Sequence, residues 1–163
     1  MNLILPIGIS GSGKTQILRK YYEHDDDWTI VCPDDIRKDL TGNISDQSKN
    51  KEVFDLVYFL IDACVKQNKN CFLDATNVNT YNRKMLVNKY KNNPNVIVQY
   101  DILPADVKLS YERIQNDLKN GVDRSNVPME ILEKQKKSYQ KSLDSGFEGE
   151  NVQSVIFVND LNL

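Results

Sequence analysis

Short apolar runs alternate along the chain with longer stretches in which apolar residues recur at spacings of three and four. The short runs have the length and the β-branched or aromatic content of strands, and they lie at residues 3–7, 28–32, 71–77, 96–103 and 152–158. The periodic stretches predict helices that begin near residues 14, 33, 46, 79, 104 and 128. Because strands that alternate with helices favour right-handed crossovers, we expect an α/β domain with a five-stranded parallel sheet flanked by helices on both faces.

The connection between the first strand and the first helix is rich in glycine. It reads Gly8-Ile9-Ser10-Gly11-Ser12-Gly13-Lys14-Thr15 and fits G-x-x-x-x-G-K-[ST] without a substitution. Glycine lets such a loop turn tightly with its N–H groups pointing inward, where they and the positive end of the following helix can bind phosphate. The lysine can reach the β- and γ-phosphates, and the threonine hydroxyl can bind Mg²⁺. The motif therefore predicts a site for ATP or another nucleoside triphosphate with Mg²⁺, formed by Gly8, Ser10, Gly11, Ser12, Gly13, Lys14 and Thr15.

Two aspartates lie at the carboxyl ends of predicted strands. Asp34 comes after the second strand, at the edge where open α/β sheets place their sites, and Arg37 lies three residues on, on the same side of a short helix. Aspartate is also a favoured helix N-cap, and the roles of cap and catalytic base are not exclusive. Asp74 lies toward the carboxyl end of the third strand and can hold Mg²⁺ directly or through water. The next residue is Ala75, so no adjacent glutamate activates water, which counts against a dedicated hydrolytic ATPase.

Composition and charge exclude several classes of protein. The 163 residues predict one domain, 1–163, and the 21 Lys and Arg against 23 Asp and Glu give a net charge of −2. Without a global basic field, any site for a polyanion must be a local patch. Cys32, Cys64 and Cys71 lack metal-site spacing and are interpreted as reduced core residues. Because no apolar run approaches 18 residues and no signal peptide is recognisable, we expect a cytoplasmic protein that is neither membrane-spanning nor secreted.

Two further charged features are interpreted as solvated surface. The acidic run at residues 24–27 is expected to be a turn, and His24 at its start is given no catalytic role. The last predicted helix carries Lys134, Lys136, Lys137 and Lys141, which we expect to face solvent and not a ligand.

Taken together, these motifs resemble a known family. The phosphate loop, the Asp-Asp-x-Arg after the second strand, the Asp-x-Thr-Asn after the third and an arginine in a loop before Val-Pro match the polynucleotide 5′-hydroxyl kinases. These are the end-healing kinase domains of bacteriophage and bacterial RNA-repair enzymes. The resemblance covers essentially the whole chain, and Asp-Asp-x-Arg is its most discriminating motif. It implies a P-loop NTPase of the nucleotide-kinase type with a short lid at residues 119–128.

On the side of the phosphate donor, the resemblance implies that Lys14 and Thr15 hold ATP or another nucleoside triphosphate and its Mg²⁺. Arg124 matches the lid arginine that closes on the β- and γ-phosphates. The family often has a second basic residue four positions before that arginine, and this chain has Asn120 there. Either Lys119 or Arg113 takes the second role, or one lid cation suffices.

On the side of the acceptor, the resemblance implies that Asp34 is the general base for a 5′-hydroxyl and that Arg37 contacts the neighbouring phosphate. Asp74, Thr76 and Asn77 are then expected to support the acceptor pocket. The partner would be the 5′-hydroxyl end of a DNA or RNA strand, and the sequence does not separate the two. An enzyme of this kind would act in the cytoplasm, including that of a host cell if phage-encoded, as a stand-alone kinase or as a module of a longer protein.

Two alternatives remain open at this point. The phosphate loop and the two aspartates would serve equally well in a kinase for a small hydroxylated acceptor, such as a nucleoside, a nucleotide or a sugar. The other alternative is a nucleotide-binding regulatory module. The chain contains no Asn-Lys-x-Asp for guanine and no Asp-Glu after the third strand, which makes this module the weaker alternative. The oligomeric state is not indicated by the sequence.

Overall fold

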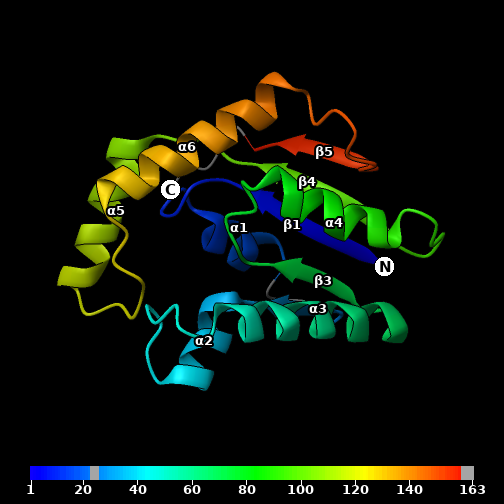
Figure 1. Cartoon of the computed structure of the whole chain (residues 1–163), viewed down its shortest axis with the longest axis horizontal. Helices are drawn as coiled ribbons and strands as arrows, with labels where there is room; N and C mark the ends of the chain where they lie inside the picture. The colour runs from blue at the N-terminus through cyan, green and yellow to red at the C-terminus, as the bar shows by residue number, and fades with distance from the viewer. Residues whose placement is uncertain (23–25, 159–163) are drawn as a thin grey trace.

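A computed structural model describes residues 1–22 and 26–158 of the chain (Figure 1). The elements of the described chain are β1 (Asn2–Ile7), α1 (Lys14–Tyr21), β2 (Trp28–Val31), α2 (Pro33–Thr41), α3 (Asn50–Gln67), β3 (Asn70–Leu73), α4 (Thr80–Tyr90), β4 (Ile97–Ile102), α5 (Val107–Lys119), α6 (Met129–Asp144) and β5 (Ser154–Phe157). The strands form one parallel sheet in the order β2-β3-β1-β4-β5. The expected α/β class and five-stranded parallel sheet are confirmed.

The central strand β1 is hydrogen-bonded on both sides. Its Leu3 is paired with Cys71 of β3 and with Val98 of β4. After β1 the chain forms β2 and β3 on one side of that strand, and it then crosses to form β4 and β5 on the other side. The carboxyl end of β1 is therefore the topological switch point, the place where open α/β sheets bind ligands. The loops after β1, β2 and β3 all emerge at this edge.

The side chains of β1 alternate between two unequal cores. Leu3, Leu5 and Ile7 belong to the larger core with α3, α4 and α6, whereas Ile4 packs with Leu18 of α1 and with Phe72 on the opposite face. Figure 1 shows α4 in front of the sheet and α1 behind it. Helices therefore cover both faces, because right-handed crossovers place connections that run in opposite directions on opposite faces.

Several predicted boundaries differ from the structure. Pro104 does not begin a helix, because α5 starts at Val107 after Asp106, whose side chain accepts a hydrogen bond from the Leu109 N–H at 2.9 Å. The third helix begins at residue 50 and not at 46. The third strand ends at Leu73, after which residues 74–79 form a loop.

Other expectations are met or fall outside the described residues. Asn79 caps α4, where the fourth helix was expected to begin, accepting from the Asn82 N–H at 3.1 Å. The turn expected at residues 24–27 lies only partly within the described residues, and His24 lies outside them. Among the described helices, none combines the length and hydrophobicity needed to cross a lipid bilayer.

Candidate active site

The phosphate loop follows β1 and makes two close backbone approaches. Gly11 has φ +77°, and a Cβ there would lie 2.6 Å from the Ser110 backbone oxygen of α5. A Cβ on Gly8 would lie 2.5 Å from Ser12 Oγ. Gly13, at φ 103°, precedes the first residue of α1. Glycine is required here by geometry, since both the left-handed backbone and the contact with α5 exclude a side chain.

Lys14 is folded back over the loop. Its Nζ donates to the carbonyl oxygens of Gly8 at 3.2 Å and Ile9 at 2.7 Å. Burial lowers the pKa of Lys14 to about 8; the negative charge of Asp74 opposes this shift, whereas the positive charge of Arg124 adds to it. The ammonium group is therefore held at the loop with backbone carbonyls as its partners, where an anionic phosphate would stabilise its charged form.

The residues present fit a nucleoside triphosphate with Mg²⁺. Ser12 Oγ is buried without a hydrogen-bond partner among the described residues, inside a loop whose glycine positions leave no room for side chains. Thr15 Oγ1 donates to Asp74 Oδ2 at 3.0 Å, so a hydroxyl and a carboxylate meet at the start of α1. Burial raises the pKa of Asp74. Hard oxygen donors of this kind suit Mg²⁺, so Thr15 and Asp74 would hold the ion.

The residues expected on the acceptor side, Asp34 and Arg37, lie on α2, directly after β2. The helix begins at Pro33 with Cys32 as its N-cap, so Asp34 is not the N-cap that its residue type allows. The Asp34 carboxylate instead accepts a hydrogen bond from Arg37 Nη1. The Asp34 side chain is 48% exposed, whereas that of Arg37 is 6% exposed. The carboxylate is thus oriented by a buried arginine and open to solvent.

The Arg37 guanidinium has hydrogen-bond donors beyond the one that Asp34 uses. Its Nη1 and Nη2 make long hydrogen bonds, both 3.4 Å, to the Ile44 carbonyl oxygen and to Asn50 Oδ1. Its Nε is buried and has no acceptor among the described residues. A buried donor without a partner is costly, so this atom marks a place where an incoming anion would complete the hydrogen bonds.

The two sides of the site share one electrostatic environment. The charges of Asp34 and Arg124 both act on the pKa of Lys14, from opposite directions. Asp34 and Asp35 also contribute to the raised pKa of Asp74. The structure therefore brings Asp34, which follows β2, within electrostatic range of the phosphate loop and of the acid that follows β3.

The loop between α5 and α6 lies where the lid was expected, and Figure 1 shows it approaching the α2–α3 connection. Asp123 accepts a 2.5 Å hydrogen bond from Lys38 Nζ of α2, and Ser125 Oγ donates to the Ile44 carbonyl oxygen at 3.3 Å. Arg124 Nη1 donates to Asp117 Oδ2 at 2.5 Å, while its buried Nε has no acceptor among the described residues. The loop therefore contacts α2 and the α2–α3 connection, and its Arg124 is held by α5.

The structure distinguishes the two candidates for the second basic residue of the lid. Arg113 Nη1 donates a long hydrogen bond, 3.5 Å, to the Gly11 carbonyl oxygen of the phosphate loop. Lys119 is exposed at the far end of α5. Arg113 is therefore the one that lies at the phosphate loop.

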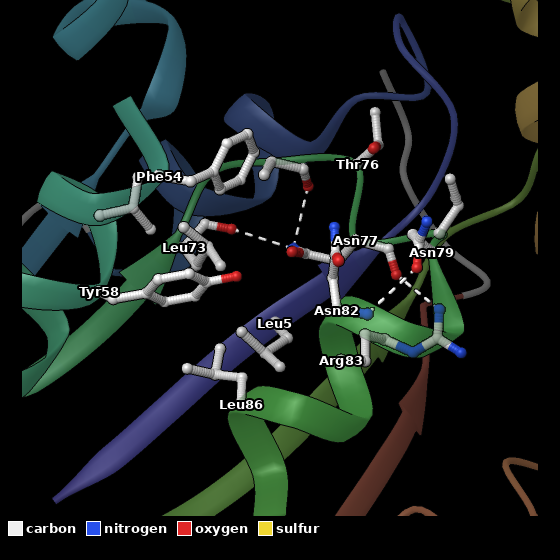
Figure 2. Close-up of a pocket in the computed structure, with 13 residues that line it drawn as sticks. Leu5, Phe54, Tyr58, Leu73, Thr76, Asn77, Asn79, Asn82, Arg83 and Leu86 are labelled. Carbon is white, nitrogen blue, oxygen red and sulfur yellow. Dashed lines mark hydrogen bonds between the residues drawn. The ribbon is translucent and has the colours of Figure 1, made fainter. Parts of the chain in front are cut away.

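The loop after β3 joins the phosphate loop through its backbone. The Gly8 N–H donates to the Thr76 carbonyl oxygen at 3.1 Å. Asn77, at φ 50°, donates from Nδ2 to the carbonyl oxygens of Pro6 at 2.9 Å and Leu73 at 3.2 Å. The Asn77 amide nitrogen thus fixes the loop internally. Thr76 and Asn77 also line a small cavity between α3, α4 and this loop (Figure 2).

Two other residues at or near the site carry no signal in the sequence. Gln135 of α6 accepts from the Ser10 N–H at 2.8 Å and donates to Ser10 Oγ at 3.2 Å. In the sequence Gln135 is one neutral residue within a lysine-rich stretch, so no pattern singled it out.

Of the four lysines predicted to face solvent, Lys134, Lys137 and Lys141 are exposed, and Lys136 donates to the Ala105 carbonyl oxygen.

The second of these residues is Arg83 of α4, which is buried and forms a two-point ion pair with Glu150. Its Nε and Nη2 donate to the two Glu150 carboxylate oxygens at 2.9 and 2.8 Å, and its Nη1 donates to the Asn77 carbonyl oxygen at 2.7 Å. Burial and the hydrogen bond to Glu150 raise the pKa of Tyr100, which joins the same cluster. Arg83 therefore anchors the loop after β3 from behind.

Comparison with solved structures finds the same fold in several known proteins. The chain is similar to a chain in the structure of the Pnkp1/Rnl/Hen1 RNA repair complex, with 21% identity and a TM-score of 0.77 over 88% of this chain and 45% of that one. It is also similar to a Chloroflexus aurantiacus protein provisionally described as a kinase, with 14% identity and a TM-score of 0.62 over 80% and 77% of the two chains.

A third similar structure is the tunicamycin resistance protein of Deinococcus radiodurans, with 15% identity and a TM-score of 0.56 over 99% and 88% of the two chains. At these identities the likeness shows the fold alone. The chain spans less than half the length of the repair-complex chain, of which it covers 45%. A search of the curated proteins found no match.

A protein-family model described as an AAA domain matches residues 3–142. The match includes the phosphate loop, α2 and the loop between α5 and α6, and it extends over most of the chain. The chain therefore belongs to this family, AAA_33, and the expected α/β fold with a phosphate loop after its first strand is confirmed.

Proposed function

We propose that the protein transfers the γ-phosphate of ATP, or of another nucleoside triphosphate, to the 5′-hydroxyl end of a polynucleotide. The single observation that carries this proposal is the Asp34 carboxylate. It is half exposed, it is oriented by a buried arginine whose Nε has no acceptor within the described part of the chain, and it lies within electrostatic range of Lys14. A general base needs such access to the acceptor, and the donor phosphate must lie nearby.

The chemistry follows from the side chains. Asp34 accepts the proton of the 5′-hydroxyl as its oxygen bonds to the γ-phosphorus, and the bond from that phosphorus to the β,γ-bridging oxygen breaks in line, releasing ADP. Lys14, together with Arg113 and Arg124, supplies positive charge for the transferring group. When bound, Mg²⁺ neutralises charge on the β- and γ-phosphates, and Thr15 and Asp74 would hold it.

The acceptor assignment rests on Arg37. Its buried Nε has no acceptor in residues 1–22 and 26–158, and its Nη1 is already bound to Asp34. A phosphate next to the acceptor hydroxyl would complete the guanidinium and keep the hydroxyl beside the base. Similarity to a chain of an RNA repair complex supports a polynucleotide acceptor. The net charge of −2 is consistent with recognition of a strand end, which requires few phosphate contacts.

A panel of acceptors tests the proposal. Label transfer from γ-labelled ATP is measured to 5′-hydroxyl DNA, 5′-hydroxyl RNA, nucleosides and sugars, with Lys14→Ala as a control that should lose at least about 10²-fold in rate. We expect labelled oligonucleotide whose yield falls with added salt. Label on nucleosides or sugars alone would contradict the polynucleotide assignment and favour a small-molecule kinase. ATP binding without any labelled acceptor would indicate a nucleotide-binding module.

A further inference from the structure

Helix α3 has two apolar stripes, of which only one is buried. The buried stripe packs in the interior of the domain and is formed by Val53, Val57, Ile61 and Cys64. The second stripe, called here the outer stripe of α3, consists of Leu56, Phe59, Leu60 and Ala63. Its spacing of three, one and three residues places these side chains along one side of the helix. Figure 1 shows α3 along the lower edge of the molecule and β5 near the upper edge.

The outer stripe is exposed at three of its four positions. Leu56, Phe59 and Leu60 are 39%, 66% and 36% exposed, so the residues described in the structure leave much of their apolar surface in contact with solvent. A surface helix usually combines one apolar stripe with a polar outer side. A contiguous apolar patch on that outer side is typical of a surface that binds another protein.

Two opposite charges lie at the ends of the outer stripe. Glu52 precedes Phe59 by seven residues, and Lys66 follows it by seven. Because seven residues are nearly two helical turns, each charge lies within about 20° of Phe59 around the helix axis and about 10 Å from it along the axis. Neither charge forms an ion pair within residues 1–22 and 26–158. Phe59, the most exposed residue of the stripe, is therefore midway between an acid and a base.

This arrangement is complementary to itself. If a second α3 packs antiparallel on the first, with a two-fold axis through Phe59, then the two Phe59 rings meet at the centre. Glu52 of each copy then lies opposite Lys66 of the other copy, at both ends of the contact. A parallel arrangement would instead place Glu52 opposite Glu52. Charges at the rim of an apolar contact select its orientation and register in this way.

We propose that the outer stripe of α3 is the interface of a homodimer, in which α3 packs antiparallel against α3 of a second copy of this chain. The proposal goes beyond the phosphoryl transfer and does not depend on it. Phe59 is the apolar centre of the interface, and the two Glu52–Lys66 pairs form its polar rim. Because one pair of helices buries less area than a standard interface, we expect a reversible dimer with a Kd of about 1–100 µM.

Sedimentation equilibrium between about 1 and 500 µM protein tests the association. The wild type should fit a monomer–dimer equilibrium, and Phe59→Glu should raise the Kd at least about 30-fold, as for a residue at the centre of an interface. Phe157→Glu is the matched control, because Phe157 is 58% exposed but belongs to β5 at the opposite edge of the molecule. Its Kd should stay within about twofold of wild type. Circular dichroism checks that both variants fold.

A charge exchange tests the antiparallel register. Glu52→Lys should raise the Kd about 10-fold, because it removes both ion pairs and places lysines opposite each other at both ends. Adding Lys66→Glu restores opposite charges and should return the Kd to within about threefold of wild type. A wild type that stays monomeric at about 500 µM would overturn the proposal. So would a dimer that Phe59→Glu leaves intact, or a double variant that associates as weakly as Glu52→Lys.

Discussion

Two arginines of this domain are buried and paired with carboxylates, yet their surroundings differ. Arg83 is 2% exposed, its partner Glu150 has a fully buried side chain, and each of its three guanidinium nitrogens donates a hydrogen bond. Arg37 is 5% exposed, but its partner Asp34 is half exposed, and its Nε has no acceptor among the described residues.

The difference separates a structural pair from one arranged for a ligand. Arg83, whose guanidinium nitrogens all donate hydrogen bonds, needs no further partner. It holds α4, the loop after β3 and the turn after α6 together. A buried guanidinium with one donor unpaired lowers stability by the desolvation free energy of that donor, and a bound anion would remove this penalty by accepting the hydrogen bond. Arg83 should therefore affect stability and Arg37 should affect the reaction.

The largest expected effect is on the stability provided by Arg83. Arg83→Met would leave the Glu150 carboxylate buried without its partner and should lower the free energy of unfolding by about 3–5 kcal/mol. Arg37→Met is the matched control and should lose about 1 kcal/mol or less, because solvent screens the half-exposed Asp34. Urea denaturation measures both values, and equal losses in the free energy of unfolding would contradict the distinction between the two arginines.

The second effect concerns catalysis by Arg37. Arg37→Ala should lower kcat/KM by about 10- to 100-fold, the range for a hydrogen bond to a charged group. The loss should be equal for an oligonucleotide and for a 3′-phosphorylated mononucleoside, because one phosphate is contacted. Steady-state kinetics on the two acceptors check this. A loss confined to the oligonucleotide would make Arg37 a general backbone contact.

A smaller effect is expected at Gln135, which supports the phosphate loop through Ser10. Gln135→Ala should raise the KM for ATP by about 2- to 10-fold, as for a neutral hydrogen bond, with little change in kcat. Lys134→Ala changes an exposed neighbour and serves as the control. An unchanged KM for ATP would show that the contact with Ser10 does not position the loop for the nucleotide.

Much of the fold was predictable because its signals are local. Apolar runs marked the five strands, and the phosphate motif marked the switch point of the sheet. The third strand was predicted too long, since residues 74–77 continue its composition, whereas Asn77 at φ 50° turns the chain. Pro104 was mistaken for a helix start because the cap that begins α5, Asp106, lies two residues further on.

The sites predicted from sequence are those that lie beside a strand end or within a motif. Asp34 and Asp74 fall in this group, because parallel strands deliver their carboxyl ends to one edge. Arg83 and Glu150 are 67 residues apart, and Gln135 contacts a residue 125 positions away, so no local pattern could pair them. The cavity beside Tyr58 likewise forms only when α3 and α4 pack on the sheet.

The central claim is that Asp34 takes the proton of the acceptor hydroxyl. Single-turnover transfer of labelled γ-phosphate to a 5′-hydroxyl oligonucleotide, compared among wild type, Asp34→Asn and Asp35→Asn, tests it most directly. We predict a rate at least about 10²-fold lower in Asp34→Asn. Asp35→Asn, a change at the exposed neighbour, should stay within about twofold of wild type. A near-normal rate in Asp34→Asn would contradict the account.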